Sequence, residues 1–447
     1  MCYSRNEIRS TGSCRTYRLN GIAALPRHMS RLLLTRSAVL TALLASLSTT
    51  ASADLDIAEA VSLALTDDPV VAASQARAQA LRDSAVADGQ LPDPQLKTGI
   101  YNLPVDDFDV SREPSTQFRL GLVQEFPRGD SRHYKKKQTE WMASAEQANT
   151  EAARRQLVRD VRKGFLELYY QLQAEQVISE TRDLFAQLVD ITQVHYATGR
   201  VSQQDVLRAS LELSRLDDRT TRIRTEADRG RATLSKWIGD AAMLPVSQDF
   251  PALPELPPRE DIETGLSQHP VILAQAARLE ASNQQIRIAH EQFKPGWSAG
   301  LEYRKRFGED PNGADRADMV AAMVTVDLPF FTANRQDKRL SASIEQAESV
   351  QLTRDNALRE LKQMLDADYA NWQRLGERAD LYSNQLLNAA TSNAQASLNA
   401  YQSGVTEFTT LMRARITDLD VRLEELRVRV DRAKAQASLL YLAGEVQ

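Results

Sequence analysis

One segment of the sequence occurs twice. Residues 196–207 resemble residues 401–411, and Gly199 maps onto Gly404 at a displacement of 205 residues. A long run of apolar residues with heptad-like spacing leads into each copy, and a second run leads out of it. A similarity at a fixed displacement indicates a duplicated structural unit. Each copy therefore predicts a tight turn between two very long antiparallel helices.

The N-terminal residues have the features of a secretory signal. A basic segment begins at Met29, a short apolar stretch follows it, and Ala51-Ser52-Ala53 forms a small-residue cleavage site. The apolar stretch is shorter than the roughly 20 residues that a membrane-spanning helix needs. We expect residues 29–53 to be a cleaved signal peptide and residues 1–28 to be a mis-assigned or cleaved extension.

The expected mature chain has no cysteine, because Cys2 and Cys14 both precede the cleavage site. This excludes disulfides and cysteine-based metal sites. Removing residues 1–53 takes away seven Arg and one Glu, which leaves 48 basic and 59 acidic side chains. A net acidic chain argues against a nucleic-acid partner, since binding to phosphates requires a cationic surface. The mature sequence also lacks any run of 18 apolar residues, so we expect no transmembrane helix.

Three prolines and glycines of the first half recur in the second half at a displacement of 201 residues. The pairs are Pro69 and Pro270, Pro94 and Pro295, and Gly99 and Gly300. We therefore divide the mature chain into a first structural repeat, residues 54–244, and a second structural repeat, residues 262–447. A proline-rich segment, residues 245–261, forms the linker between them.

Each repeat contains two segments in which apolar and polar residues alternate, which predicts β-strands. The segments are residues 95–101, 117–126, 297–306 and 319–328, paired as hairpins with long acidic loops at 104–114 and 308–318. A tilted strand of about 9–11 residues can cross a membrane, and a small soluble sheet is the alternative. Four strands cannot close a membrane barrel, which usually has at least eight strands. A membrane sheet would therefore require several copies of the chain.

A very long helix is predicted after each hairpin, from about Ser131 to Thr198 and from about Asn334 to Ser403. Apolar residues recur in both at steps of three and four, as in Leu157, Val161, Phe165, Leu168 and Leu172. Close to 70 residues correspond to roughly 100 Å of helix. Heptads sustained over this length indicate coiled-coil packing. We therefore predict a mainly α-helical fold with duplicated long helical hairpins and a small β part.

In this order, the elements resemble the TolC-type outer-membrane efflux factors. The resemblance covers residues 54–447 and rests on the Asp68-Pro69 and His269-Pro270 helix starts, the strand-ending Pro127 and Pro329, and the two Tyr-x-x-Gly turns. It implies a homotrimer in which twelve transmembrane strands form one β-barrel and the long helices form one α-helical tunnel. It also implies a location in the outer membrane, with a long periplasmic helical part.

The resemblance implies that the chain is a passive export duct of a tripartite efflux system. The implied partners are a periplasmic adaptor, an inner-membrane transporter of the RND type and outer-membrane lipid. Residues 91–96, 102–107 and 125–129 look more like the heavy-metal branch of the family, which makes heavy-metal cations a candidate cargo. The alternative function is a periplasmic coiled-coil scaffold or adaptor with a soluble β domain. Adaptors usually have one helical hairpin, whereas this chain has two.

The sequence contains no constellation that points to catalysis or to a cofactor. His290-Glu291 lacks the second histidine of a zinc-protease helix, and there is no Gly-rich phosphate loop. His133, His195 and His269 are also scattered, and among the methionines only Met319 and Met323 lie close together. We expect neither an enzyme nor a metal site, so a partner pump must supply the energy for export.

The two glycine turns resemble the periplasmic tip at which the family docks its adaptor. The tip residues are Gly199, Arg200, Val201, Ser202, Gly404, Val405 and Thr406. Glycine permits the left-handed conformation that ends a helix, and Ser202 and Thr406 can cap the helix that follows. The same residues would also suit a turn with no docking role.

Asp205 and Glu407 follow the turns and are candidates for an acidic gate that narrows the tunnel and favours cations. The helix dipole alone also favours a carboxylate at a helix start, which is the alternative reading. The basic run at residues 132–137 either lies at the inner face of the membrane or is a solvated helix face.

Overall fold

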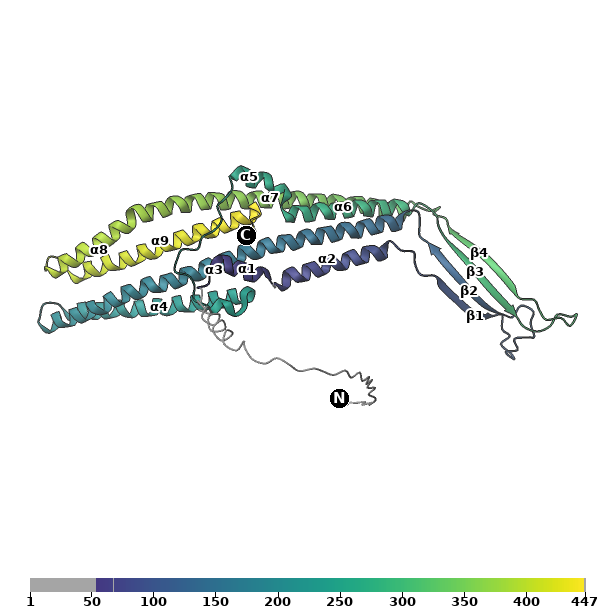
Figure 1. Ribbon diagram of the computed structural model, residues 1–447, viewed down its shortest axis with the longest axis horizontal. Coiled ribbons are helices and arrows are strands. Elements are labelled where there is room, and N and C mark those ends of the chain that lie inside the picture. Colours follow the sequence, from purple (N-terminus) through teal and green to yellow (C-terminus); the bar gives the residue numbers. More distant parts are fainter. Residues whose placement is uncertain (1–53, 67, 446–447) are drawn as a thin grey trace, which may run out of the picture. The chain divides into compact units, whose positions relative to one another are not determined.

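The structure is a computed structural model that describes residues 54–66 and 68–445. The predicted extension and signal peptide lie outside the described residues. Two runs of elements follow one another in the same order, as Figure 1 shows. The first comprises α1 (Ile57–Thr66), α2 (Pro69–Asp88), β1 (Gln95–Tyr101), β2 (Gln117–Phe126), α3 (Ser131–Ala197) and α4 (Gln203–Ile238). The second comprises α5 (Arg259–Gly265), α6 (Pro270–Glu291), β3 (Gly296–Arg306), β4 (Met319–Asp327), α7 (Gln336–Leu381), α8 (Leu387–Gln402) and α9 (Phe408–Ala443).

Helices α2 and α6 begin at the predicted X-Pro positions. The Asp68 carboxylate accepts hydrogen bonds from the backbone N–H groups of Val70 and Val71, at 2.9 and 3.0 Å. In α6 the neutral Nδ1 of His269 accepts from the N–H of Val271. In both helices proline occupies the first turn, where no intrahelical bond needs its missing N–H. The two repeats therefore start equivalent helices with different capping groups.

The four strands form one antiparallel sheet in the order β1-β2-β3-β4. The predicted bounds of the first hairpin match the structure, and those of the second differ by one residue. Strands β2 and β3 join the two repeats, and the rings of Phe126 and Trp297 stack there with centroids 4.0 Å apart. Strands β1 and β4 lie at the two edges, so the sheet of one chain is open. No helix among the described residues is long and apolar enough to span a membrane.

The strand register separates an apolar face of the sheet from a polar face. One cross-strand row runs Leu96, Leu122, Leu301 and Ala322, and the next runs Thr98, Leu120, Tyr303 and Val320. On the opposite face the rows contain Lys97, Glu302, Arg119 and Arg304, and the Arg119 guanidinium lies 3.8 Å from the Glu302 carboxylate. Many apolar residues of the first face are exposed in the single chain, for example Leu96 at 67 % and Val320 at 70 %.

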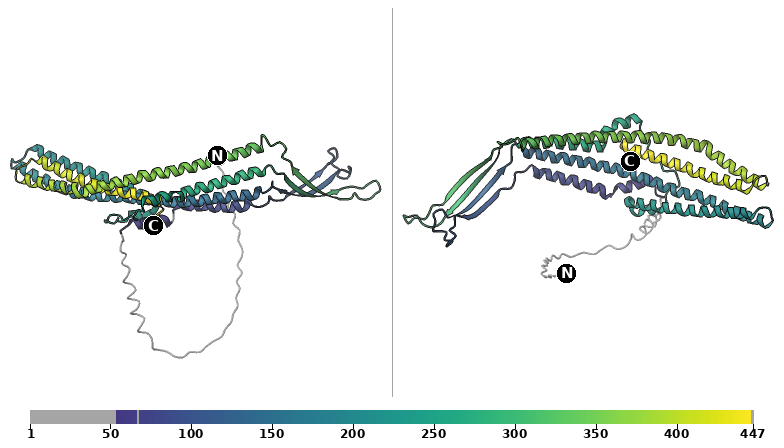
Figure 2. Two further views of the ribbon diagram at one scale, coloured as in Figure 1. Left: turned by 90° about the horizontal axis from the view of Figure 1, so that it is seen from above. Right: turned by 180° about the vertical axis from the view of Figure 1, so that it is seen from behind.

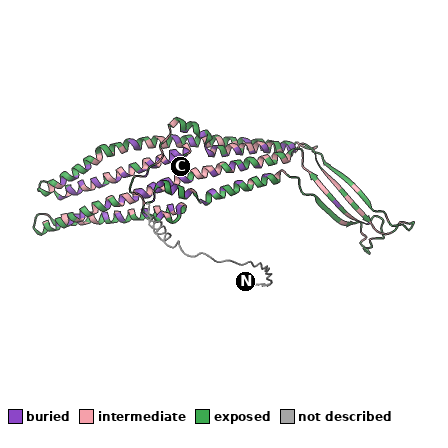
Figure 3. Ribbon diagram, in the orientation of Figure 1, coloured by how far each residue is buried: buried purple, intermediate pink, exposed green. Residues whose placement is uncertain are grey.

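Helix α3 is packed against α1, α2, α4, α6 and α9. The predicted apolar positions Leu157, Val161, Phe165 and Leu168 are all buried. Figures 1 and 2 show α3 and α4 as one hairpin and α8 and α9 as part of the other, lying side by side. Figure 3 shows buried residues alternating with exposed ones along the helices, as amphipathic helices in a layer require.

The second long helix spans the predicted residues within two positions at each end, but it is not α-helical throughout. Helix α7 gives way to a π turn at Tyr382–Leu386, after which α8 begins. No residue of this turn is buried. Tyr382, which is partly buried, packs against the cluster of Leu375, Val428 and Ala435.

The proline-rich linker lies across the middle of the helices. The N–H of Leu55 donates to the carbonyl of Pro245 at 2.7 Å, and the hydroxyl of Tyr169 donates to the carbonyl of Gln248 at 3.2 Å. Farther along, the Gln436 side chain on α9 donates to the carbonyl of Pro254 at 2.7 Å. The linker therefore contacts α3 near its middle and α9 near its C-terminal end.

A second connection between the repeats lies where the helices meet the sheet. The buried carboxylate of Glu291, at the end of α6, accepts from the N–H of Asp130 at 2.7 Å and from Lys294 at 2.8 Å. Arg128 donates to the carbonyl of Gln292 at 2.9 Å. Gly129 has a φ of 47°, and a Cβ at this position would overlap the Glu291 carboxylate. Only glycine therefore lets this turn approach α6.

We predict that Gly129→Ala destabilises the protein by roughly 2–4 kcal/mol, because it combines a left-handed backbone penalty with overpacking. Urea unfolding of the purified protein in detergent measures this loss. Gly265→Ala is the matched control, since Gly265 has a φ of −67° and nothing within 4 Å of an added Cβ. Equal unfolding midpoints for the two variants would show that the close approach of the Gly129 turn to Glu291 does not require glycine.

Candidate functional site

Each pair of long helices is closed by a turn with a left-handed glycine. Gly199 has a φ of 71° and Gly404 a φ of 74°, and nothing lies within 4 Å of a Cβ added to either. The N–H of Arg200 donates to the carbonyl of His195 at 2.8 Å, and the N–H of Val405 donates to that of Ala400 at 2.9 Å. Such bonds satisfy carbonyl groups that would otherwise be unpaired at a helix C-terminus.

The helices that leave the two turns are capped differently. The Ser202 hydroxyl oxygen accepts from the N–H of Asp205 at 3.3 Å, and the Asp205 carboxylate accepts from the N–H of Ser202 at 3.2 Å. This reciprocal arrangement is a capping box. In the second turn the N-cap residue is Glu407, and its side chain makes no capping hydrogen bond.

The prediction that Thr406 caps the second helix is therefore wrong. Glu407, and not Thr406, lies 205 residues after Ser202, so the repeat spacing itself contained the correct assignment. The residue that matches Asp205 at this spacing is Thr410, which has no carboxylate. Asp205 and Glu407 thus occupy different positions in their respective turns.

Both turns border one hollow of about 750 Å³. The residues predicted for this end of the chain that line it are Gly199, Arg200, Val201, Ser202, Asp205, Gly404, Thr406 and Glu407. Val405 does not line it and is 81 % exposed. Residues from the two helical hairpins, separated by about 200 positions in the sequence, therefore meet at one end of the described chain.

Sequence reasoning did not assign the aromatic group of this hollow, or one of its cations, to the site. The ring of His195 lies 6.3 Å from the ring of Tyr401, whose other neighbour is the buried Phe408 at 5.6 Å. Arg208, three residues after Asp205 on α4, also lines the hollow and adds a cation to it. The repeat pairs Tyr401 with Tyr196, but Tyr196 is 48 % exposed, so the spacing alone does not distinguish the packed tyrosine from the exposed one.

No metal site is found in the part of the chain that the structure describes, where no group of three or more His, Cys, Asp or Glu side chains converges. His269 is buried beside Tyr441 and caps α6. Burial and the nearby Arg155 lower the pKa of His269 to about 4, so its imidazole is neutral at pH 7. This histidine serves the helix rather than a ligand.

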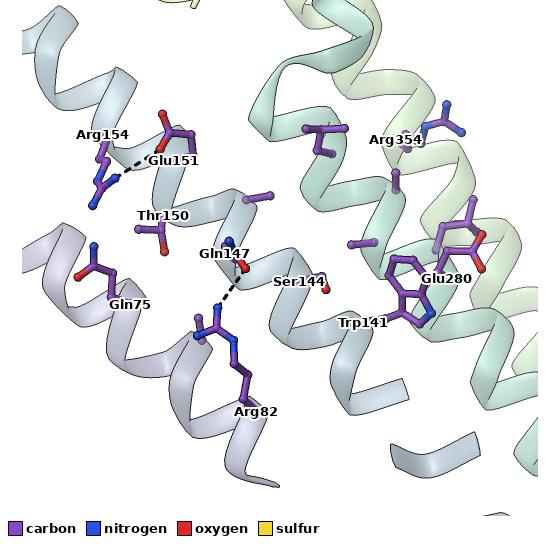
Figure 4. A pocket seen from close by; sticks show the side chains of 16 residues that line it. Gln75, Arg82, Trp141, Ser144, Gln147, Thr150, Glu151, Arg154, Glu280 and Arg354 are labelled. Carbon is purple, nitrogen blue, oxygen red and sulfur yellow. Dashed lines mark hydrogen bonds and ion pairs between the residues drawn. The ribbon is translucent and has the colours of Figure 1, made fainter. Parts of the chain in front are cut away.

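A larger hollow of about 900 Å³ lies among α2, α3, α6 and α7 (Figure 4). Its polar side chains pair within its own walls: Arg82 donates to Gln147 at 3.0 Å, and Arg154 lies 3.7 Å from Glu151. The exposed indole of Trp141 forms part of the wall. This hollow presents no pair of groups arranged for proton transfer or nucleophilic attack.

The model of the family described as outer membrane efflux protein matches residues 60–240 and 262–445. Among curated proteins, none matches the chain. Several solved structures share its fold. CusC superposes with a TM-score of 0.75 at 16 % identity, covering 88 % of this chain and 92 % of that chain.

Two further structures superpose nearly as well. VceC from Vibrio cholerae has a TM-score of 0.72 at 17 % identity, covering 87 % of this chain and 96 % of its own. The open state of MtrE from Neisseria gonorrhoeae has a TM-score of 0.72 at 16 % identity, covering 87 % and 88 %. These likenesses confirm the predicted fold of long helices with four antiparallel strands.

We predict that Ser202→Ala weakens the start of α4 by about 1 kcal/mol, because it removes the capping oxygen. Hydrogen–deuterium exchange in detergent should then be about fivefold faster for the first amides of α4. Thr406→Ala is the matched control and should leave the start of α9 unchanged. If the two substitutions accelerated amide exchange equally at the starts of α4 and α9, the conclusion that the two helices are capped differently would be contradicted.

Proposed function

Because this chain belongs to the outer membrane efflux protein family, the TolC-type channels, we propose that three copies of it form a passive export duct that docks a periplasmic adaptor. Proteins of this family are outer-membrane channels with a periplasmic helical tunnel and not enzymes. They are trimeric components of tripartite pumps. A periplasmic scaffold or adaptor, the alternative function, does not agree with this family.

The open four-stranded sheet is the main support for the proposed trimer. One chain has four strands with free edges at β1 and β4, and three chains joined edge to edge give the twelve strands of a closed barrel. The apolar face of the sheet would then contact lipid, and the face with Lys97, Arg119 and Glu302 would line the water-filled interior. An isolated chain would leave the apolar face in water.

The outer helices support the same assembly. Val70 and Val86 on α2 are 59 % and 60 % exposed, and Ile344 and Leu352 on α7 are 46 % and 62 % exposed. Contact with another copy would remove this apolar surface from water. Contact of α7 in one copy with α2 in the next would cover both groups and continue the edge pairing of β4 with β1.

We further propose that the two turns dock the adaptor and that an inner-membrane transporter of the RND type drives export. Val405 is highly exposed, and both glycine turns leave open space around their backbones. A partner can therefore approach these turns without displacing core residues. Asp205 and Glu407 would place two carboxylates per chain, six per trimer, near the tunnel end, where they would favour cations.

Heavy-metal cations are the proposed cargo. The support is the resemblance of residues 91–96, 102–107 and 125–129 to the heavy-metal branch, together with these tip carboxylates. The cargo would pass through the duct without a resident metal site.

The duct is tested with the purified protein. Without boiling, it should migrate on a gel at about three times its boiled mass, and it should open cation-selective channels in planar bilayers. Asp205→Asn and Glu407→Gln should each lower the ratio of cation to anion permeability, because charge is removed from the proposed gate. Glu263→Gln, at an exposed carboxylate on α5, is the control. An unboiled monomer with no conductance would overturn the duct, and unchanged selectivity in both gate variants would overturn the gate.

Docking and cargo are tested in cells that lack this gene. The wild-type gene should restore resistance to heavy-metal salts, and the double variant Gly199→Pro/Gly404→Pro should not, although its trimers reach the membrane. Gly313→Pro is the control, since Gly313 has a φ of 77° and equally open surroundings in the β3–β4 loop. Full export by the double variant would refute docking at the turns. If cells that lack the gene became sensitive to organic compounds but not to heavy-metal salts, the proposed cargo would be refuted and the duct would not.

A further inference from the structure

The polar face of the sheet is charged unevenly along the strands. Its members are the strand residues that alternate with the apolar rows, and the strand register gives their order from the hairpin loops to the helices. Four cations lie in the half nearer the loops: Lys97, Arg119, Arg304 and Arg306. One carboxylate, Glu302, lies among them. In the half nearer the helices, the described strand residues of this face include two carboxylates, Glu125 and Asp327, and no cation.

Two of these cations share one carboxylate. The Nε of Arg304 donates to Glu302 at 2.5 Å, and the Nε of Arg119 lies 3.8 Å from the same carboxylate. The Arg119 guanidinium also lies 4.0 Å from the ring centre of Tyr101, the last residue of β1. These contacts hold both guanidinium groups on the polar face, and one carboxylate cannot neutralise two cations.

Arg306 is the cation nearest the loops. Its Nε donates to the carbonyl of Ala317 at 2.9 Å, and its backbone N–H donates to Asp318 at 3.3 Å. The Asp318 carboxylate also accepts from the hydroxyl of Tyr303, which belongs to the apolar face. Even with Asp318 counted, this half has four cations and two carboxylates, which is a net charge of +2 for each chain.

The hairpin loops beyond this half of the sheet are acidic. Residues 104–114 contain four carboxylates and one Arg, and residues 308–317 contain three carboxylates and one Arg. Arg112 lies 2.7 Å from Asp106 and 2.7 Å from Asp107, so part of the loop charge is paired within the loop. The positive zone is therefore bounded by negative charge on its loop side as well as on its helix side.

In the proposed barrel of twelve strands, this face would enclose a narrow space. Strands about 4.8 Å apart and tilted by about 40° give a backbone diameter of roughly 24 Å. Side chains that project inward narrow the opening further. Because the Debye length in 0.1 M salt is about 10 Å, the field of charges on the wall reaches the axis.

We propose that the four cations form a cationic girdle that concentrates anions in the half of the barrel nearer the loops. Under the proposed function, on which this inference rests, three chains give the girdle a net charge of +6. Rings of charged side chains of one sign select ions of the other sign. The girdle is thus opposite in charge to the carboxylates at the turns. A divalent metal cation would cross it more readily as a complex with anionic ligands than as the bare ion.

The test measures the local potential with charged thiol reagents. Gln117 and Val123 are half-buried residues of the polar face of β2, one in each half of the sheet. Gln117→Cys and Val123→Cys are introduced singly into the full-length protein, whose expected mature sequence has no other cysteine. Each protein in detergent reacts with an anionic and, separately, with a cationic methanethiosulfonate. The result is the ratio of the anionic rate to the cationic rate at each position.

This ratio should be about tenfold higher at residue 117 than at residue 123 in dilute salt, and the difference should nearly vanish in 1 M salt, where the Debye length is about 3 Å. Arg306 is the cross-strand partner of Gln117, so Arg306→Gln should lower the ratio at residue 117 by about threefold. Lys305→Gln is the matched control, since Lys305 lies beside Arg306 but on the apolar face, and it should leave the ratio unchanged.

The mobility of each unboiled variant on a gel separates the girdle from the duct. In a protein that migrates as a trimer, equal ratios at the two positions, or equal effects of Arg306→Gln and Lys305→Gln, would overturn the girdle and retain the duct. A protein that migrates as a monomer would overturn the duct. If the ratio in that monomer were still higher at residue 117, the girdle would be a property of the single sheet, and if the ratios were equal, both proposals would fail.

Discussion

The fold depends on the continuous burial of one face of α3. A helix of 67 residues is stabilised mainly by packing against its neighbours rather than by helix propensity. Helices α1, α2, α4, α6 and α9 each cover part of α3, and together they bury side chains from Leu157 to Phe185. Because these neighbours come from both repeats, the two repeats share the core along α3.

The two repeats are joined at four levels. In the sheet, strands β2 and β3 pair with one another. Where the sheet meets the helices, the N–H of Asp130 donates a hydrogen bond to Glu291. Farther from the sheet, the linker contacts both α3 and α9. The lowest level, near the glycine turns, consists of side-chain contacts such as that of His195 with Tyr401. Backbone hydrogen bonds thus fix the repeats at the sheet, and packing alone holds them at the turns. A chain joined in this way is firm at one end and adaptable at the other.

Much of the fold could be predicted because it is determined by local pattern. The alternation of apolar and polar residues predicted the bounds of both strands of the first hairpin. The heptad spacing identified Leu157, Val161 and Phe165 as buried. The displacement of 205 located both turns. The π turn could not be predicted in this way, because the two long helices have the same number of residues. The absence of buried residues does not mark the turn either, because residues 348–360 of α7 have none and are α-helical.

The candidate site was predicted only in part for a related reason. The glycines and their neighbours are recognisable because a left-handed turn needs them, and the structure places most of them around one hollow. The contacts of His195, Tyr401 and Phe408 depend on how two distant hairpins meet, which no local spacing encodes.

The unequal caps at the two turns have a consequence for recognition. At Ser202 the helix start is held by a pair of reciprocal hydrogen bonds, whereas the start of α9 at Glu407 has no side-chain cap and is anchored by the buried Phe408 and Leu411. A partner that contacted both turns would therefore meet two helix starts that are secured in different ways, one by polar capping and the other by apolar packing.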